Sequence, residues 1–330
     1  MRLHLSKRRL ISLIALLTLL AVVIAGALNV QRIQDTVLYY QFEPSATVAS
    51  FASDAGMSEH GTFLFYASHP EVLGADDFNK QCGKSEHSTA ILGCYNGRTI
   101  YIYDVTNARL TGIRSTTAAH EMLHAAYRRL SDSEKTKVNA LLEAEYSMLK
   151  ESDTLVSRMA YYERAQPGER GNELHSIIGT EVEVVSEELE AYYAKYLSDR
   201  SKVVAQHVQY RTVFEDLSTK SEALAAQIDQ LGVSIQAQKA EYTNGSSVLR
   251  GDIANFNARA NQGDFTDQAA FNRERQVLVN RSSALDDLRS KINQSVEEYN
   301  KLVAELNAIA LETDTLNRSM DSQVAPAPSL

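Results

Sequence analysis

Two histidines four positions apart, His120 and His124, constrain this chain more than any other feature of its sequence. On a helix, residues four apart share a face, so both imidazoles can point at one metal ion. Glu121 directly follows the first histidine, where it can take a proton from metal-bound water. Such a metal needs a third protein ligand and an open position for water. The chain is therefore expected to form a helix here and to bring a further ligand to it from elsewhere.

The segment His120–His124 has the HExxH pattern of zinc hydrolases, in which two histidines bind zinc and the glutamate acts as the base. The alternative is a surface helix that carries two histidines by chance. The residues around the motif favour the zinc interpretation, because a predicted strand precedes it and a predicted carboxylate-bearing helix follows it.

Charge and cysteine content exclude two other classes of protein. The formal net charge of −9 argues against a nucleic-acid-binding surface. There are two cysteines and no CxxC pair, which argues against a cysteine-based zinc site. The length of 330 residues is enough for one or two domains.

The N-terminus has the pattern of a membrane anchor. An uncharged apolar run, Leu10 to Leu28, follows four basic residues, Arg2, Lys7, Arg8 and Arg9. At about 1.5 Å per residue, such a run nearly crosses a bilayer core of about 30 Å. Positive charge before the run places the N-terminus in the cytoplasm and the rest of the chain outside.

We therefore expect residues 1–9 in the cytoplasm, a signal anchor at 10–30 that crosses the cell membrane once, and the bulk of the chain outside it. The rival interpretation is a cleaved signal peptide with Ala25-Gly26-Ala27 as its small-residue site. Both interpretations export everything after Asn29.

Residues 31–200 are predicted to form an α+β domain, mostly helical with a small sheet. Thr47–Met57 fits a short helix, and Gly61–Ala67 and Arg98–Asp104 alternate as strands do. Outside the cytoplasm, Cys82 and Cys94 are expected to form a disulfide. This disulfide would stabilise the fold by about 3 kcal/mol, because closing the short loop lowers the conformational entropy of the unfolded chain.

The helices around the motif have recognisable ends. One of Ser115, Thr116 and Thr117 is expected to cap the motif helix. Ser131–Glu134 is a capping box that starts a new helix, which Pro167-Gly168 ends. Asn172 is expected to cap a further helix.

The third ligand is not obvious from the motif. Metzincins would place Gly and His where Tyr127 and Leu130 stand, so that pattern fails. A thermolysin-like gap would use Glu143 or Glu145, which fall inside one long predicted helix and fit poorly.

The segment Arg170-Gly-Asn-Glu173 to Thr180-Glu181 resembles the gluzincin helix of lethal-factor-like and Mlc-titration-factor-like metallopeptidases. That resemblance implies a glutamate ligand at the helix start and a second acidic residue one to two turns later. Glu173 and Glu181 are the alternatives for the third ligand. The resemblance also implies a tyrosine that steadies the tetrahedral intermediate, for which Tyr161 and Tyr162 are candidates.

Residues 201–320 carry two long apolar seams at steps of three and four, which predict an antiparallel helical hairpin or coiled coil. Asn261–Thr266 is the expected turn, with Thr266 or Asp267 as the next cap. A parallel coil between two chains is the alternative. The hairpin is a candidate for self-association or for binding a surface partner, and 321–330 is expected to be a disordered tail.

The sequence thus favours a membrane-anchored, extracytoplasmic zinc metallopeptidase. We expect Zn²⁺ to be held by His120, His124 and one glutamate. The zinc would activate a water molecule, and Glu121 would deprotonate it. The substrate would be a peptide or protein outside the membrane, and its peptide bonds would be hydrolysed. The alternative is a non-catalytic scaffold or adhesion protein with a zincin-like domain and a coiled-coil arm.

Overall fold

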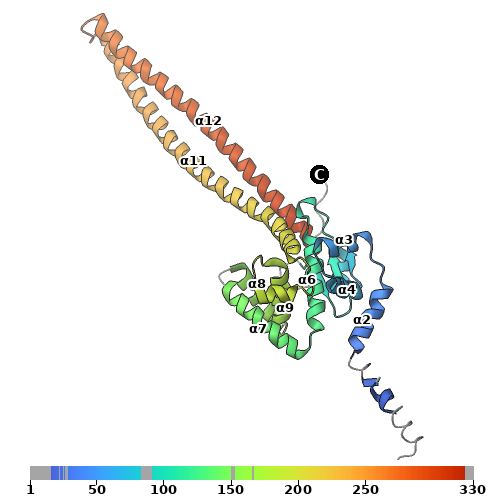
Figure 1. Cartoon of the computed structure of the whole chain (residues 1–330). Helices are drawn as coiled ribbons and strands as arrows, with labels where there is room; N and C mark the ends of the chain where they lie inside the picture. Colours follow the sequence, from blue (N-terminus) through green and yellow to red (C-terminus); the bar gives the residue numbers. More distant parts are fainter. Residues whose placement is uncertain are drawn as a thin grey trace, which may run out of the picture. The chain divides into compact units, whose positions relative to one another are not determined.

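The computed structural model describes residues 16–21, 23–24, 26, 29–82, 91–149, 153–165 and 167–323. They divide into two compact units. The globular unit comprises Met1–Val213 with Leu316–Leu330, and the hairpin unit comprises Phe214–Thr315. The described chain is mostly helical with one small sheet, which confirms the expected α+β class at that level (Figure 1).

The globular unit contains short helices before and after the sheet. In chain order its helices are α2 (Val30–Gln41), α3 (Ala46–Asp54), α4 (Glu59–Ala67), α5 (Ala75–Cys82), the 3-10 helix η1 (Ala108–Leu110), α6 (Ile113–Arg128), α7 (Asp132–Leu149), α8 (Asp153–Ala165), α9 (Arg170–Glu181) and α10 (Glu187–Tyr193). The capping box predicted at Ser131–Glu134 forms, because the backbone N–H of Ser131 donates to Glu134 Oε2 over 2.8 Å.

The sheet has the strand order β1-β3-β2. β1 (Glu71–Leu73) pairs parallel with β3 (Ile100–Tyr103), and β2 (Gly93–Tyr95) pairs antiparallel with it. β3 lies within the strand predicted at 98–104, and its Ile100 and Ile102 are fully buried. β1 and β2 are three residues each, too short to show an alternating pattern.

The strand predicted at Gly61–Ala67 is wrong, because these residues belong to α4. The alternation of Phe63, Phe65 and Ala67 suggested a strand, but the buried positions are Gly61, Leu64, Phe65 and Ala67. Leu64 and Phe65 follow Gly61 by three and four residues, and Ala67 follows Leu64 by three, as on one face of a helix. The side chain of Ser58 caps this helix by accepting from the backbone N–H of Gly61.

α6 lies at the centre of the globular unit and carries the HExxH motif. It packs against α3, α4, α9, β2 and β3. Ala118, Ala119, Ala125 and Ala126 are buried on it, so its neighbours approach closely. At the α6–α9 crossing, a Cβ on Gly179 would lie only 2.5 Å from Leu123 Cδ1, so this glycine permits the close approach of the two helices.

Among the described residues, no helix combines the length and the apolar character that crossing a membrane requires. Ten of the 21 residues of the anchor predicted at 10–30 lie outside the described residues. At the other end, Ser322 falls in the segment expected to be disordered, yet it is buried and its hydroxyl donates to Asn79 Oδ1. Residues 324–330 lie outside the described residues.

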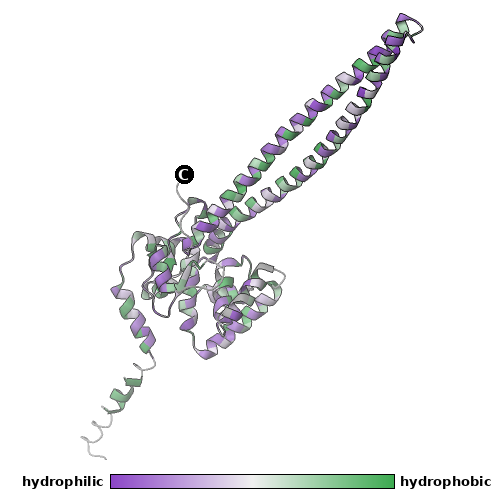
Figure 2. Ribbon diagram, turned by 180° about the vertical axis from the view of Figure 1, so that it is seen from behind, coloured by the Kyte–Doolittle hydropathy of each residue, from purple (hydrophilic) through white to green (hydrophobic). Residues whose placement is uncertain are grey.

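The hairpin unit consists of the parts of two long helices, α11 (Arg200–Gln262) and α12 (Gln268–Met320), that fall within Phe214–Thr315. These parts run side by side in opposite directions (Figure 1). Gly263 turns the chain with φ +74°, and Asp267 caps α12 by accepting from the backbone N–H of Ala270. Phe256, Phe265 and Phe271 cluster beside this turn. Apolar and polar residues alternate along both arms (Figure 2).

Candidate metal centre

The motif helix starts earlier than its sequence suggests. Gly112 precedes it with φ +93°, a conformation that L side chains rarely adopt, and α6 begins at Ile113. Ser115, Thr116 and Thr117 are therefore buried within the helix instead of capping it. Thr117 donates to the carbonyl of Ile113, so its hydroxyl is satisfied within the helix.

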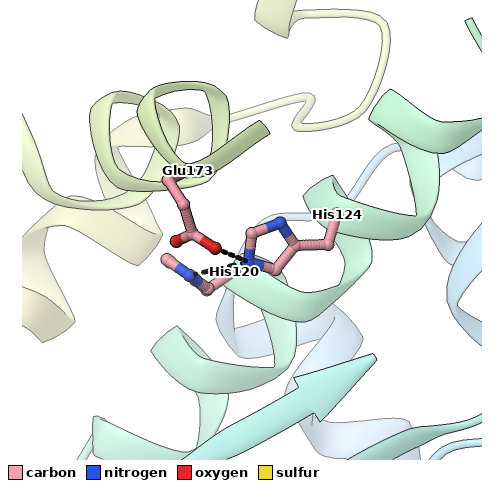
Figure 3. A group of neighbouring side chains, drawn as sticks. All are labelled: His120, His124 and Glu173. Atoms are coloured by element: carbon pink, nitrogen blue, oxygen red, sulfur yellow. Dashed lines mark hydrogen bonds and ion pairs between the residues drawn. The ribbon is translucent and has the colours of Figure 1, made fainter. Parts of the chain in front are cut away.

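His120, His124 and Glu173 bring their ligand atoms together between α6 and α9 (Figure 3). The Nε2 atoms of His120 and His124 are 3.1 Å apart, and Glu173 Oε1 lies 3.8 Å from His124 Nε2. All three ligand atoms lie within 4.8 Å of one another. Three ligands of a tetrahedral zinc, each about 2.1 Å from the ion, lie about 3.4 Å apart. The cluster therefore fits a zinc ion with small side-chain adjustments.

Two side chains of α9 hold the ring of His124. Asn172 Oδ1 and Ser176 Oγ each lie 3.0 Å from His124 Nδ1. The amide nitrogen of Asn172 donates to Glu169, and the Ser176 hydroxyl donates to the carbonyl of Asn172. Both oxygens therefore face Nδ1 as acceptors, Nδ1 carries the proton, and the lone pair of Nε2 points into the cluster.

Burial keeps the histidines of this region neutral at pH 7. It lowers the pKa of His120 well below its usual range and that of His124 to about 4. His175, two residues after Glu173, is fully buried with a pKa lowered to about 3, and its Nε2 lies 2.9 Å from the hydroxyl of Tyr192. Neutral imidazoles at His120 and His124 are the form that binds a metal.

Glu121 is buried beside the cluster and is only partly satisfied. The backbone N–H of Tyr95 on β2 bonds to its carboxylate, whereas Oε2 has no hydrogen-bond partner. Burial and the nearby carboxylate of Glu173 raise its pKa well above the usual range. β2 passes close to it, since a Cβ on Gly93 would lie 2.8 Å from Glu121 Cγ. Glu121 thus has one carboxylate oxygen held by the strand and one oxygen free to accept a proton.

The structure separates the two alternatives for the third ligand. Burial raises the pKa of Glu173 to about 7, helped by Glu169 and opposed by Arg158. Glu181, two turns further along α9, instead accepts two hydrogen bonds from Arg158, at 2.7 and 2.8 Å. Glu173 is therefore the carboxylate that lies with the histidines, and Glu181 is held away from them in an ion pair.

A cavity of about 410 Å³ opens over the cluster. Its walls include the three ligand candidates, Glu121, strand β2, Tyr162 from α8, and Arg158, Glu181 and Tyr210. Burial raises the pKa of Tyr162, which keeps its hydroxyl protonated as a donor. The side chain of Tyr161, the other tyrosine candidate, lies outside the part of the chain that the structure describes.

A disulfide joins Cys82 at the end of α5 to Cys94 on β2, and both cysteines line the cavity. It ties the edge strand that contacts Glu121 to the rest of the globular unit. Residues 83–90 of the closed loop lie outside the described residues.

Sequence reasoning missed several residues of this site. Asn172 was expected to cap a helix, but it lies inside α9 and orients His124. Gly93, Arg158 and Tyr210 line the cavity without belonging to any motif. The close packing that makes Gly93 necessary is visible only in three dimensions.

Comparisons of the chain with protein-family models, curated proteins and solved structures found no match.

Proposed function

We propose that this protein is a zinc-dependent metallopeptidase of the HExxH type, anchored in a membrane with its site outside the cytoplasm. The observation that carries the proposal is the convergence of His120, His124 and Glu173, with the unpaired Oε2 of buried Glu121 beside them. A carboxylate oxygen without a partner is costly in a buried site, and such a cost is common where a group takes part in chemistry.

His120, His124 and Glu173 would hold the zinc ion, because two imidazoles and one carboxylate are a usual donor set of catalytic zinc. When bound, zinc polarises the scissile carbonyl and allows water to act as a nucleophile near neutral pH. A dication at this position would also lower the pKa of Glu121, which otherwise stays high through burial and Glu173.

Glu121 is the general base of the proposed reaction. Its free Oε2 accepts a proton from the attacking water while the backbone N–H of Tyr95 fixes the other side of the carboxylate. The same carboxyl group then gives the proton to the leaving amine, which completes peptide-bond hydrolysis. Tyr162, on the cavity wall with a raised pKa, would donate its hydroxyl hydrogen to the developing oxyanion.

The location rests on the N-terminal sequence and on the disulfide. The apolar run Leu10–Leu28 follows a basic stretch, the arrangement of a signal anchor that exports the rest of the chain. A disulfide at Cys82–Cys94 is typical of an oxidising compartment. The proposed substrates are therefore polypeptides outside the membrane.

The test is a paired measurement of zinc and of hydrolysis on the detergent-purified full chain. We expect one zinc per chain, hydrolysis of members of a peptide library that a chelator abolishes, and retained zinc but a loss of at least about 10³-fold in hydrolysis for Glu121→Gln. A chain without stoichiometric zinc, or a Glu121→Gln variant with full activity, would contradict the proposal. Zinc retained without hydrolysis of any peptide would favour the non-catalytic scaffold instead.

A further inference from the structure

Helix α2 has its polarity reversed relative to an ordinary surface helix. Asp35, its only acidic residue, is 3% exposed, and its carboxylate accepts two hydrogen bonds from the guanidinium of Arg129, the residue that follows α6. The ring of Tyr39 packs on Phe63 with centroids 5.1 Å apart. The polar Asp35 thus faces inward, where a surface helix normally places apolar residues.

The opposite face of α2 is apolar and uncovered. Val30, Ile33, Val37 and Tyr40 follow one another at steps of three, four and three residues, so they share one side of the helix. Their exposed fractions are 48, 52, 50 and 81%. By helical geometry, the centre of this stripe lies about 180° from Asp35 around the helix axis. A contiguous group of exposed apolar side chains such as this marks a surface that contacts another molecule or a membrane.

We propose that this apolar face of α2 lies in the interfacial layer of the bilayer that the N-terminal segment enters. Three observations favour lipid. The apolar run Leu10–Leu28 ends directly before α2, and the described residues between 16 and 24 continue the exposed apolar surface. The outward face bears no carboxylate, since Asp35 is turned inward, and the exposed Arg32 can meet lipid phosphates. Tyr40 is a residue type enriched at membrane interfaces.

The size of the face argues against a second copy of the chain as its occupant. A stable interface between two proteins buries about 800 Å² on each partner, supplied by about 20–30 residues. α2 has 12 residues and four of them form the face. A helix lying in the interface needs no more than such a stripe, because each buried side chain contributes separately to membrane affinity.

This inference deepens the proposed location and rests on it. It places the globular unit, of which α2 is a part, against the outer membrane surface. The Asp35–Arg129 ion pair holds α2 to α6, and the cavity is therefore within reach of polypeptides at that surface. It does not depend on zinc or on hydrolysis. A failure of the catalytic proposal would leave the membrane experiment unchanged.

The experiment reconstitutes the full chain in vesicles of phosphatidylcholine with about one-fifth phosphatidylglycerol. Single cysteines at Ile33→Cys or Val37→Cys carry an environment-sensitive fluorophore, and Gln31→Cys, exposed on the other side of α2, is the matched control. We expect blue-shifted emission and at least about twofold quenching by spin-labelled lipid at positions 33 and 37, with little quenching at position 31.

Each alternative gives a different result. If the chain resists alkaline extraction, it is anchored in the membrane. Equal, water-like emission at all three positions in such a chain overturns the proposal for α2 and leaves the anchor standing. Extraction of the chain from the vesicles overturns both the anchor and the α2 proposal. Blue-shifted emission at Val37→Cys without lipid quenching, together with cross-linking between two such cysteines, identifies a second copy as the occupant and also overturns the proposal.

Discussion

Asn172 Oδ1 lies 3.0 Å from Nδ1 of His124, although 48 residues separate the two in the sequence. This contact joins α9 to the motif helix α6 and leaves Nε2 of the imidazole directed at His120 and Glu173. In metal sites such an outer partner fixes the ring and its tautomer. The contact therefore couples the packing of two helices to the geometry of the proposed zinc site.

Replacing Asn172 by alanine is expected to weaken zinc binding by about 10–100-fold, because His124 loses the acceptor that orients it. Competition with a calibrated chelator measures this affinity. Asn139→Ala is the matched control, since Asn139 accepts from Tyr127 and does not touch His124. Equal zinc affinity for the Asn172 variant and the wild type would show that Ser176 alone is enough to hold the ring.

Glu173→Gln and Glu181→Gln distinguish the two carboxylates of α9. We expect Glu173→Gln to weaken zinc binding by at least about 100-fold, because it removes a charged ligand. This loss is larger than the one expected for a residue, such as Asn172, that only orients a ligand. Glu181→Gln keeps a hydrogen-bond acceptor for Arg158 and should stay within about 10-fold of the wild type. The metal content of both purified variants checks this, and the reverse order would make Glu181 the ligand.

Gly93→Ala is expected to damage hydrolysis more than metal binding. The new Cβ would lie 2.6 Å from Thr117 Cγ2 and 2.8 Å from Glu121 Cγ. Either strand β2 or the side chain of Glu121 must therefore move. A displacement of about 1 Å at a reacting group costs about 100-fold in rate. The rate is measured as kcat/KM on a peptide that the wild type cleaves, beside the zinc content. Gly74→Ala, which meets nothing within 4 Å, should behave as the wild type.

Asp35→Ala should destabilise the globular unit by about 3–5 kcal/mol. The side chains of Asp35 and Arg129 are only 4% and 13% exposed, and losing one partner leaves a buried charge unpaired. Urea unfolding followed by circular dichroism gives the change in free energy. Asp77→Ala breaks a pair with Lys80 that is 69% exposed on both sides, and should change stability by less than about 1 kcal/mol. Similar losses for both variants would contradict this account.

The stability of the metal-free protein should depend on pH through His175, whose pKa is lowered to about 3 in the fold. Between that value and about 6.5, the unfolded chain binds a proton that the folded chain does not. Stability from this residue is therefore complete above pH 6.5 and falls by up to about 1.4 kcal/mol per pH unit below it. The difference in unfolding free energy between the wild type and His175→Gln isolates this effect, and a difference independent of pH would refute it.

Local sequence patterns were sufficient for much of the fold. Ser131 and Glu134 form the predicted capping box, and Asp267 caps the second long helix, because both depend on residues within one helical turn. The α4 segment was assigned wrongly, since Phe63 and Phe65 alternate as in a strand, and a pattern over so few residues does not distinguish a strand from a helix. Packing of Gly61 against the backbone of Tyr196 is a non-local contact that no short pattern contains.

By itself the sequence determined the parts of the site that a single helix can specify. A spacing of four residues places His120 and His124 on one face of α6, with Glu121 next to the first of them. Only the tertiary structure shows which of Glu173 and Glu181 lies with the histidines, because both are on α9 and their neighbours come from α6 and α8. Arg158 pairs with Glu181, whereas Oε1 of Glu173 lies 3.8 Å from Nε2 of His124. Contacts between distant segments depend on tertiary packing, and the local periodicity of the sequence does not predict them.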